Sequence, residues 1–187
     1  RGMGWKRRVW GSKPIFLARQ IMYNAAEVRN AMLSAPLYGI HCQPPPPVDW
    51  ETLVKHRAAY VHRLNNIYER NLENSHVEHL HGWGKLVDGA DGVEVAVSGG
   101  KAGELRLSAP HVLVATGARP RSIPPLPVDG QTIITSRESI LLKELPKSIV
   151  IAGGGAIGVE FAYLDRMYGV EVTVVELLPH LVPNEDE

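Results

Sequence analysis

Apolar positions in the first half of the chain repeat at helical spacing in two segments. From Arg19 to Ser34 the composition is that of a helix, and a series of prolines and glycines between positions 36 and 47 then interrupts it. A longer helix is predicted over residues 50–73, where apolar side chains recur every three, four or seven residues behind the N-cap Asp49. The proline run favours an extended connector, and residues 1–18 show neither helical nor strand periodicity.

Short strands are predicted after the second helix. Residues 77–81 form one strand, and the alternating segments 93–97 and 104–107 form a glycine-linked hairpin. The apolar run at 111–115 predicts a strand that is buried on both faces. A proline-rich connector and a short helix over 136–143 then lead to an expected domain boundary near residue 145.

The strongest local pattern lies between residues 148 and 176. The apolar segment 148–152 predicts a buried parallel strand, which runs directly into a G-x-G-x-x-G sequence formed by Gly153, Gly155 and Gly158. A helix over 159–168 and a strand over 171–175 follow, and Glu176 ends that strand. This succession of strand, glycine turn, helix, strand and acidic residue is typical of dinucleotide-binding units.

Each part of this pattern has a physical role in binding a dinucleotide. Gly153 permits the tight turn, Gly155 lets the backbone approach the pyrophosphate, and Gly158 lets helix and strand pack closely. The N-terminus of the helix offers N–H groups and a partial positive charge to the phosphates. Glu176 can accept hydrogen bonds from the ribose and would repel a 2′-phosphate, so the pattern favours NAD(H) over NADP(H). A glycine-rich turn in an unrelated α/β unit is the alternative.

Composition and charge place the chain in a broad class. Of its 187 residues 44% are apolar, and 20 basic side chains balance 20 acidic ones, as in an ordinary globular protein of one or two domains. The neutral balance argues against nucleic acid as a partner, and no apolar run is long enough for a membrane helix. Cys42 is the single cysteine, which excludes an intrachain disulfide. His79 and His81 share a strand face but are interpreted as surface residues rather than metal ligands.

Several motifs together resemble one protein family over about residues 19–187. They are the segments 114–120 and 145–148 and the glycine turn with Glu160. They are similar to the class I pyridine nucleotide-disulfide oxidoreductases, with residues 19–120 closer to glutathione reductase and residues 133–187 closer to dihydrolipoamide dehydrogenase. The resemblance implies an α/β fold with a partial FAD-binding Rossmann-like domain of three-layer ββα type over 19–145. The first βαβ unit of an NAD(P)-binding domain is expected over 146–187.

The resemblance also implies two cofactor sites. The positions that match NAD contacts are Gly153, Gly155, Ala156, Ile157, Gly158, Glu160 and Glu176. The positions that match FAD contacts are Trp83, Gly84, Thr116, Gly117, Ser136 and Arg19. Arg19 stands where the family usually carries a lysine, and Glu160 is its expected partner.

The family passes electrons from NAD(P)H through FAD and a cysteine pair to a small disulfide, and its enzymes are homodimers. Here the pair would fall at Gly11 and Phe16, so no catalytic residue is predicted. We expect a FAD-dependent NAD(P)H:disulfide oxidoreductase that acts on glutathione disulfide, with lipoamide as the alternative substrate or a non-catalytic NAD-binding remnant as the alternative function. The polypeptide is expected to be a fragment, inactive alone, with an unrelated segment at residues 1–18 and a cytoplasmic or mitochondrial location.

Overall fold

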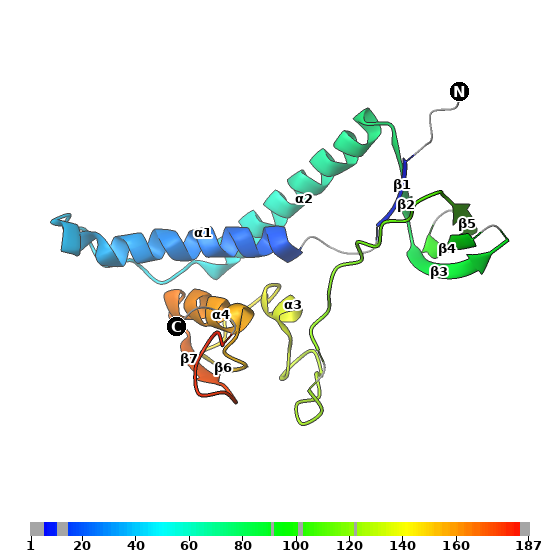
Figure 1. Cartoon of the computed structure of the whole chain (residues 1–187). Helices are drawn as coiled ribbons and strands as arrows, with labels where there is room; N and C mark the ends of the chain where they lie inside the picture. The colour runs from blue at the N-terminus through cyan, green and yellow to red at the C-terminus, as the bar shows by residue number, and fades with distance from the viewer. Residues whose placement is uncertain (1–5, 11–14, 91, 101–102, 122, 184–187) are drawn as a thin grey trace. The chain divides into compact units, whose positions relative to one another are not determined.

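The computed structural model describes residues 6–10, 15–90, 92–100, 103–121 and 123–183. The chain divides into two compact units (Figure 1). The first unit comprises residues 1–14 and 62–119, and the second comprises residues 15–61 and 120–187. The long helix α2, Trp50–Asn74, contributes residues to both. None of the described helices is both long enough and apolar enough to cross a membrane.

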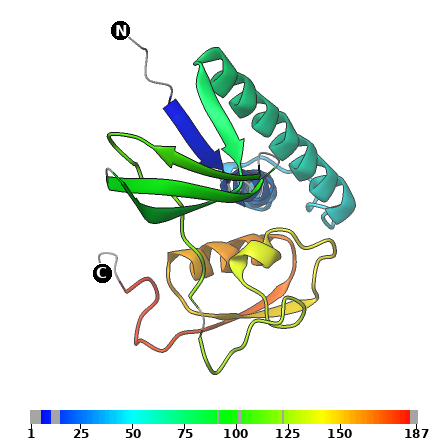
Figure 2. The ribbon, with the colours of Figure 1, turned by 90° about the vertical axis from the view of Figure 1, so that its right-hand side faces the viewer.

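The first unit contains two small sheets. Strand β1, Lys6–Trp10, runs parallel to β2, Val77–His81, and the two are paired along their whole length. Strands β3, Trp83–Gly89, β4, Gly92–Gly100, and β5, Gly103–Ser108, form an antiparallel sheet in that order. Figure 2 shows the curvature of these three strands. The predicted strand at 77–81 and the predicted hairpin are confirmed, whereas β3 was not predicted.

The second unit starts with helix α1, Ile15–Ser34, and a short 3-10 turn, Ala35–Tyr38, which ends at Gly39 in the left-handed conformation. Helix α2 begins behind Asp49, whose carboxylate accepts the N–H of Thr52 at 3.1 Å, as expected of an N-cap. Helix α3, Ser136–Ser139, is shorter than the predicted 136–143. Its N-terminus carries a capping box made by Thr135 and Glu138.

The C-terminal part of the second unit has the predicted strand–helix–strand order. Strand β6, Ser148–Ala152, and strand β7, Glu171–Val175, are parallel neighbours, and helix α4, Ala156–Met167, connects them. Helix α4 lies along one face of the strand pair (Figure 2). Both strands have the predicted bounds, because glycine follows β6 directly and Gly169 separates α4 from β7, which limits where these short β-rich runs can lie.

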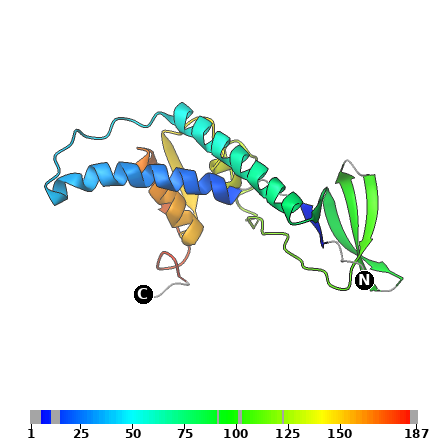
Figure 3. The same ribbon diagram turned by 90° about the horizontal axis from the view of Figure 1, so that it is seen from above.

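Helix α1 crosses α4, and their contact makes the core of the second unit (Figure 3). Small and flexible side chains of α1 allow the close approach, and larger ones from α4 and the segment after it fill the space. The buried cluster consists of Ala18, Met22, Ala26, Ile140, Phe161, Leu164, Tyr168 and Val170. The hydroxyl of Tyr168 also donates to the backbone oxygen of Met22, so a hydrogen bond ties the two helices together.

Three local expectations were wrong. Residues 1–18 contain β1 and the start of α1, because β1 is fixed by pairing with β2, far along the chain, rather than by its own periodicity. Residues 109–121 form neither helix nor strand, and Leu113 is 89% exposed. Strand β6 is covered on one face only, and Val150 is 68% exposed. An apolar run becomes a doubly buried strand only where neighbours cover both of its faces.

Candidate functional site

The turn between β6 and α4 depends on two of its glycines for its shape. Gly153 has a φ of 111°, which side chains disfavour, and its N–H donates to the backbone oxygen of Val175 at 2.8 Å. A Cβ on Gly158 would overlap the backbone oxygen of Gly153, so only glycine lets α4 start this close to the strand. These are the conformational roles that the sequence predicted for both residues.

Gly155 differs from these two glycines. It is the N-cap of α4, with a φ of −72° and an extended ψ that any residue can adopt. A Cβ built on Gly155 meets no atom within 4 Å. Neither backbone strain nor packing in the described structure therefore requires glycine here. The open space lies at the N-terminus of α4, beside Ala156 and Ile157, where backbone N–H groups and the helix dipole favour an anion.

Glu176 closes the turn from the opposite side. Its carboxylate accepts the N–H of Gly154 at 2.6 Å and the N–H of Leu178 at 2.9 Å. The hydrogen bonds from Leu178 and then Gly154 lower the pKa of Glu176, so the group is ionised at neutral pH. Each carboxylate oxygen has a second lone pair, so the group can still accept hydrogen bonds from a ligand.

The segment after Glu176 folds back over the turn, which the sequence did not predict. The N–H of Val182 donates to the backbone oxygen of Gly154 at 2.8 Å. A Cβ on Gly154 would collide with the side chain of Leu181. The middle glycine of the Gly-Gly-Gly run therefore lets Leu181 pack against the turn, and a side chain at Gly154 would require Leu181 to move. The sequence offered one signal for this role, the position of Gly154 between two motif glycines. The dinucleotide motif itself assigns no role to that position.

A partly buried ion pair joins α1 to α4 beyond the glycine turn. Arg19 of α1 donates to Glu160 of α4 with an N–O distance of 2.9 Å. Their side chains are 34% and 26% exposed, so water screens the pair only partly. The expected partnership between these residues is thus confirmed, although 141 positions separate them in the sequence.

The positions matched to FAD are divided between the two units. Four of them, Trp83, Gly84, Thr116 and Gly117, belong to the first unit, whereas Arg19 and Ser136 belong to the second. In the first unit the ring of Trp83 is 62% exposed, and the guanidinium of Arg119 lies 5.8 Å from its centroid. An accessible aromatic face beside a cation fits an anionic nucleotide. The sequence did not single out Arg119 for this contact.

The remaining FAD positions lie on exposed backbone or at a helix end. Thr116 and Gly117 are exposed in the irregular segment, where Gly117 has a φ of 74°. Ser136 is the first residue of α3. Of the two positions expected to carry redox cysteines, Gly11 lies outside the described residues and Phe16 lies in the first turn of α1.

The histidine and cysteine side chains form no further candidate site in the described part of the chain. The rings of His79 and His81 lie 4.3 Å apart on β2. Across the described residues, no group of three or more histidine, cysteine, aspartate or glutamate side chains is placed to hold a metal ion. Cys42 is exposed and donates to the backbone oxygen of Met32 at 3.5 Å.

Solved structures share this fold. LpdA from Mycobacterium tuberculosis superposes with a TM-score of 0.81 over 97% of this chain and 41% of its own, at 24% identity. The HOCl-induced flavoprotein disulfide reductase RclA from Escherichia coli, solved as a Cu(II) complex, gives a TM-score of 0.73 over 96% of this chain and 38% of its own, at 22% identity. The α/β class and the Rossmann-like architecture expected from the sequence are confirmed.

Curated relatives match in sequence. Dihydrolipoyl dehydrogenase from Chlorobaculum parvum is 48% identical over 101 residues, which are 54% of this chain and 21% of the relative. Dihydrolipoyl dehydrogenase from Mycobacterium leprae is 40% identical over 131 residues, which are 70% of this chain and 26% of the relative. The matches thus span about a quarter of the length of these relatives.

The model of one protein family, described as pyridine nucleotide-disulphide oxidoreductase, matches residues 13–187. This range contains the glycine turn, Glu176 and the Arg19–Glu160 pair. The chain therefore belongs to the pyridine nucleotide-disulphide oxidoreductase family.

Proposed function

We propose that residues 148–183 bind NAD(H), and that the chain provides this site to a FAD-dependent disulfide oxidoreductase of the dihydrolipoyl dehydrogenase type. The observation that carries the proposal is the space beside Gly155. The fold itself requires Gly153 and Gly158, whereas neither backbone strain nor packing requires glycine at position 155, which an N-cap Ser or Asp could also occupy. Room for a pyrophosphate at the N-terminus of a helix supplies a reason for glycine there.

The acidic group at the end of β7 supports the preference for NAD(H). Two backbone N–H groups hold the Glu176 carboxylate in place and keep it ionised. An ionised carboxylate can accept hydrogen bonds from ribose hydroxyls and repels a 2′-phosphate. NADP(H) is therefore the less favoured cofactor.

Arg19, with Glu160 as its counter-ion, would place a guanidinium on the flavin side of the site. A bound nicotinamide supplies the hydride in this family, and FAD receives it. The pKa of a guanidinium is too high for it to release a proton under ordinary conditions, unlike the ammonium of a lysine at this position. Glu160 orients the group through one ion pair 2.9 Å long. Arg19 therefore contributes charge and position rather than a proton.

The substrate is proposed from the relatives, which are named dihydrolipoyl dehydrogenases. Their names favour a lipoamide-like disulfide. Glutathione disulfide, which the resemblance of residues 19–120 favours, stays a prediction, as does a homodimer. Cys42 is the single cysteine in the sequence, so these 187 residues contain no dithiol. We expect the chain to bind NADH but to reduce neither disulfide when FAD is added.

A titration of the full chain with NADH tests the proposal. In a Gly155→Val variant the added side chain occupies the open space, so the NADH dissociation constant should rise at least about tenfold, the equivalent of ~1.4 kcal/mol. The melting temperature should fall only by the cost of a poorer N-cap, about 1 kcal/mol, because no protein atom lies within 4 Å of the new Cβ. The matched control is Ala58→Val on the exposed side of α2, which should leave both quantities unchanged.

Two results would contradict the proposal. One is an unchanged NADH affinity in a folded Gly155→Val variant, since the glycine would then have no role in binding. The other is tighter binding of NADPH than of NADH by the parent chain. Reduction of lipoamide or of glutathione disulfide by the chain would refute the expectation that its single cysteine cannot support turnover.

A further inference from the structure

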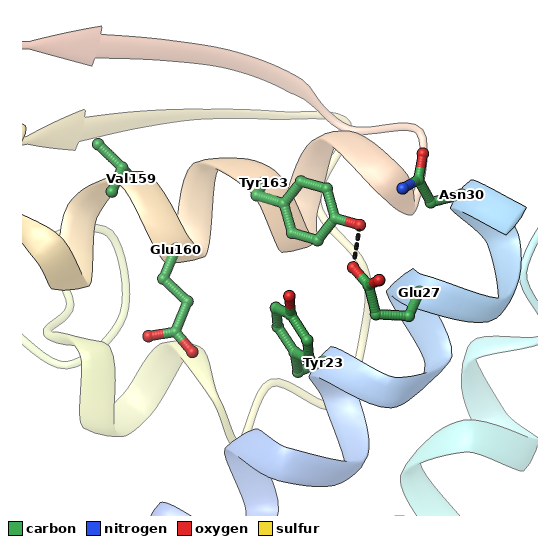
Figure 4. A pocket seen from close by; sticks show the side chains of 6 residues that line it. All are labelled: Tyr23, Glu27, Asn30, Val159, Glu160 and Tyr163. Atoms are coloured by element: carbon green, nitrogen blue, oxygen red, sulfur yellow. Dashed lines mark hydrogen bonds between the residues drawn. The ribbon is translucent and has the colours of Figure 1, made fainter. Parts of the chain in front are cut away.

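A shallow pocket of about 400 Å³, open to solvent and called the cavity below, lies between α1 and α4 within the second unit. Figure 4 shows three side chains from each helix around it. Helix α1 contributes Tyr23, Glu27 and Asn30, and helix α4 contributes Val159, Glu160 and Tyr163. The cavity lies along the middle of α4, whereas the dinucleotide turn lies at the N-terminus of that helix. Its volume is within the usual range of small-molecule sites.

Two aromatic rings form one side of the cavity. The ring centroids of Tyr23 and Tyr163 are 5.9 Å apart, and the ring planes meet at 43°. A cation is attracted to an aromatic face when it lies within about 6 Å of the centroid. At this separation a single cation can lie within that distance of both rings. Tyr23 is 41% exposed, so the site is accessible from water.

A hydrogen bond holds the second ring in place. The hydroxyl of Tyr163 donates to Glu27 Oε1 (Figure 4). The bond to Glu27 is the largest of the effects that raise the pKa of Tyr163 to about 12. Tyr163 is therefore a neutral phenol at physiological pH, and its ring keeps an orientation suited to face contact.

The two carboxylates that line the cavity have different partners. Glu160 forms an ion pair with Arg19 at 2.9 Å, whereas the exposed Glu27 accepts the Tyr163 hydroxyl and forms no ion pair among the described residues. Arg29 follows Glu27 by two residues and so leaves the helix on another side, where it donates to the backbone oxygen of Pro46 at 2.5 Å. The cavity thus combines two aromatic rings with one carboxylate that has no basic partner in the described part of the chain.

We propose that this cavity binds a small organic ammonium cation at a site separate from the dinucleotide turn. The two tyrosine faces contact the cation, and the free oxygen of Glu27 compensates its charge. Asn30 and Val159 complete the walls without adding a positive group. The proposal does not require NAD(H) to be bound, because Tyr23, Glu27 and Tyr163 carry it and choline is its first probe.

Choline is the probe, and its neutral tert-butyl analogue, which has the same shape, is the reference ligand. Binding to the full chain is measured by broadening of the ligand methyl signals in proton NMR. We expect choline to bind at millimolar concentration and the neutral analogue to bind at least about fivefold more weakly, because only the cation gains from the rings and the carboxylate. Equal binding of the two ligands, or no binding of choline, overturns the proposal.

Three variants locate the site. Tyr163→Leu and Glu27→Gln should each weaken choline binding by about two- to fivefold, the size of one exposed cation–π or ionic contact. Tyr163→Phe keeps the ring and should retain more of the affinity than Tyr163→Leu. The matched control Glu69→Gln, on an exposed position of α2, should change nothing. Circular dichroism checks that each variant is folded.

A competition experiment separates the two sites. NADH added to the choline complex should leave choline bound, because the dinucleotide is proposed to lie at the N-terminus of α4, before the residues that contact choline. Displacement of choline by NADH would show that the cavity is part of the dinucleotide site. The proposal of a separate cation site would then be wrong. Equal losses in Tyr163→Phe and Tyr163→Leu would show that the ring face does not contribute.

Discussion

Asp165 of α4 is a carboxylate in the core of the second unit, and its removal should stabilise the protein at neutral pH. The residue is 7% exposed, and its Oδ2 is buried without a hydrogen-bond partner among the described residues. Burial raises the pKa of Asp165 from 3.8 to about 6. The folded state therefore prefers the protonated acid, and ionisation opposes folding.

The size of the effect follows from this shift. A change from 3.8 to about 6 corresponds to about 3 kcal/mol at ~1.4 kcal/mol per pKa unit. The stabilisation that protonation provides is complete below pH 3.8 and is lost as the pH rises through about 6. An Asp165→Asn variant removes the ionisation. It should be more stable than the parent above pH 6 by about 2–3 kcal/mol, less the cost of a buried amide.

Urea unfolding between pH 4 and pH 8, followed by circular dichroism, measures this difference. The parent should lose stability across the interval, and Asp165→Asn should lose much less. Asp129 is the matched control because its exposed carboxylate accepts the N–H groups of Gln131, Thr132 and Ile133. These bonds lower the pKa of Asp129, so Asp129→Asn should be less stable than the parent above pH 4. Equal pH dependence in the parent and Asp165→Asn would refute the reasoning.

Three further predictions concern the turn, the cavity and the cofactor preference. Gly158→Ala should destabilise the fold by about 1–3 kcal/mol or more, measured by thermal unfolding, because the methyl group would overlap the Gly153 carbonyl; an unchanged melting temperature contradicts this. Glu27→Gln should lower the pKa of Tyr163 from about 12 towards 10.0 in an ultraviolet titration, since the hydrogen bond to the Glu27 carboxylate is the main cause of the raised pKa. An unchanged titration would show that Glu27 does not affect the ionisation of Tyr163. Glu176→Ser should reduce the NADH preference over NADPH by about fivefold or more in paired titrations, because one repulsive charge is lost; an unaltered ratio contradicts that role.

Much of the dinucleotide site could be predicted because its pattern is local. The bounds of β6 and β7 agreed with the prediction, and so did the steric roles of Gly153 and Gly158. The conformation of a tight turn depends on a few neighbouring residues, so glycines at those positions indicate it in the sequence. The hydrogen bond from Gly154 to Glu176 was not predicted, because it requires β6 and β7 to be neighbours in a known register.

Strand predictions failed where distant partners decide the outcome. The segment 111–115 is apolar enough for a buried strand but has no regular structure, whereas the basic segment Lys6–Trp10 forms one by pairing with β2. Strand β3, which contains two glycines, is fixed by its pairing with β4. β-Propensity describes how well a residue fits a half-buried sheet, so the outcome depends on whether a sheet edge is present to pair with.

The sequence by itself determined the helical segments, the glycine turn, the acidic end of β7 and, through its motifs, the family. Each of these depends on residues within one or two turns or strands of each other, where backbone sterics and capping act. Only the tertiary structure decided that Glu27 of α1 would bond to Tyr163 of α4 beside an open pocket, and that Asp165 would be buried. Those features arise from the crossing of two helices, and the packing of the whole unit fixes that crossing.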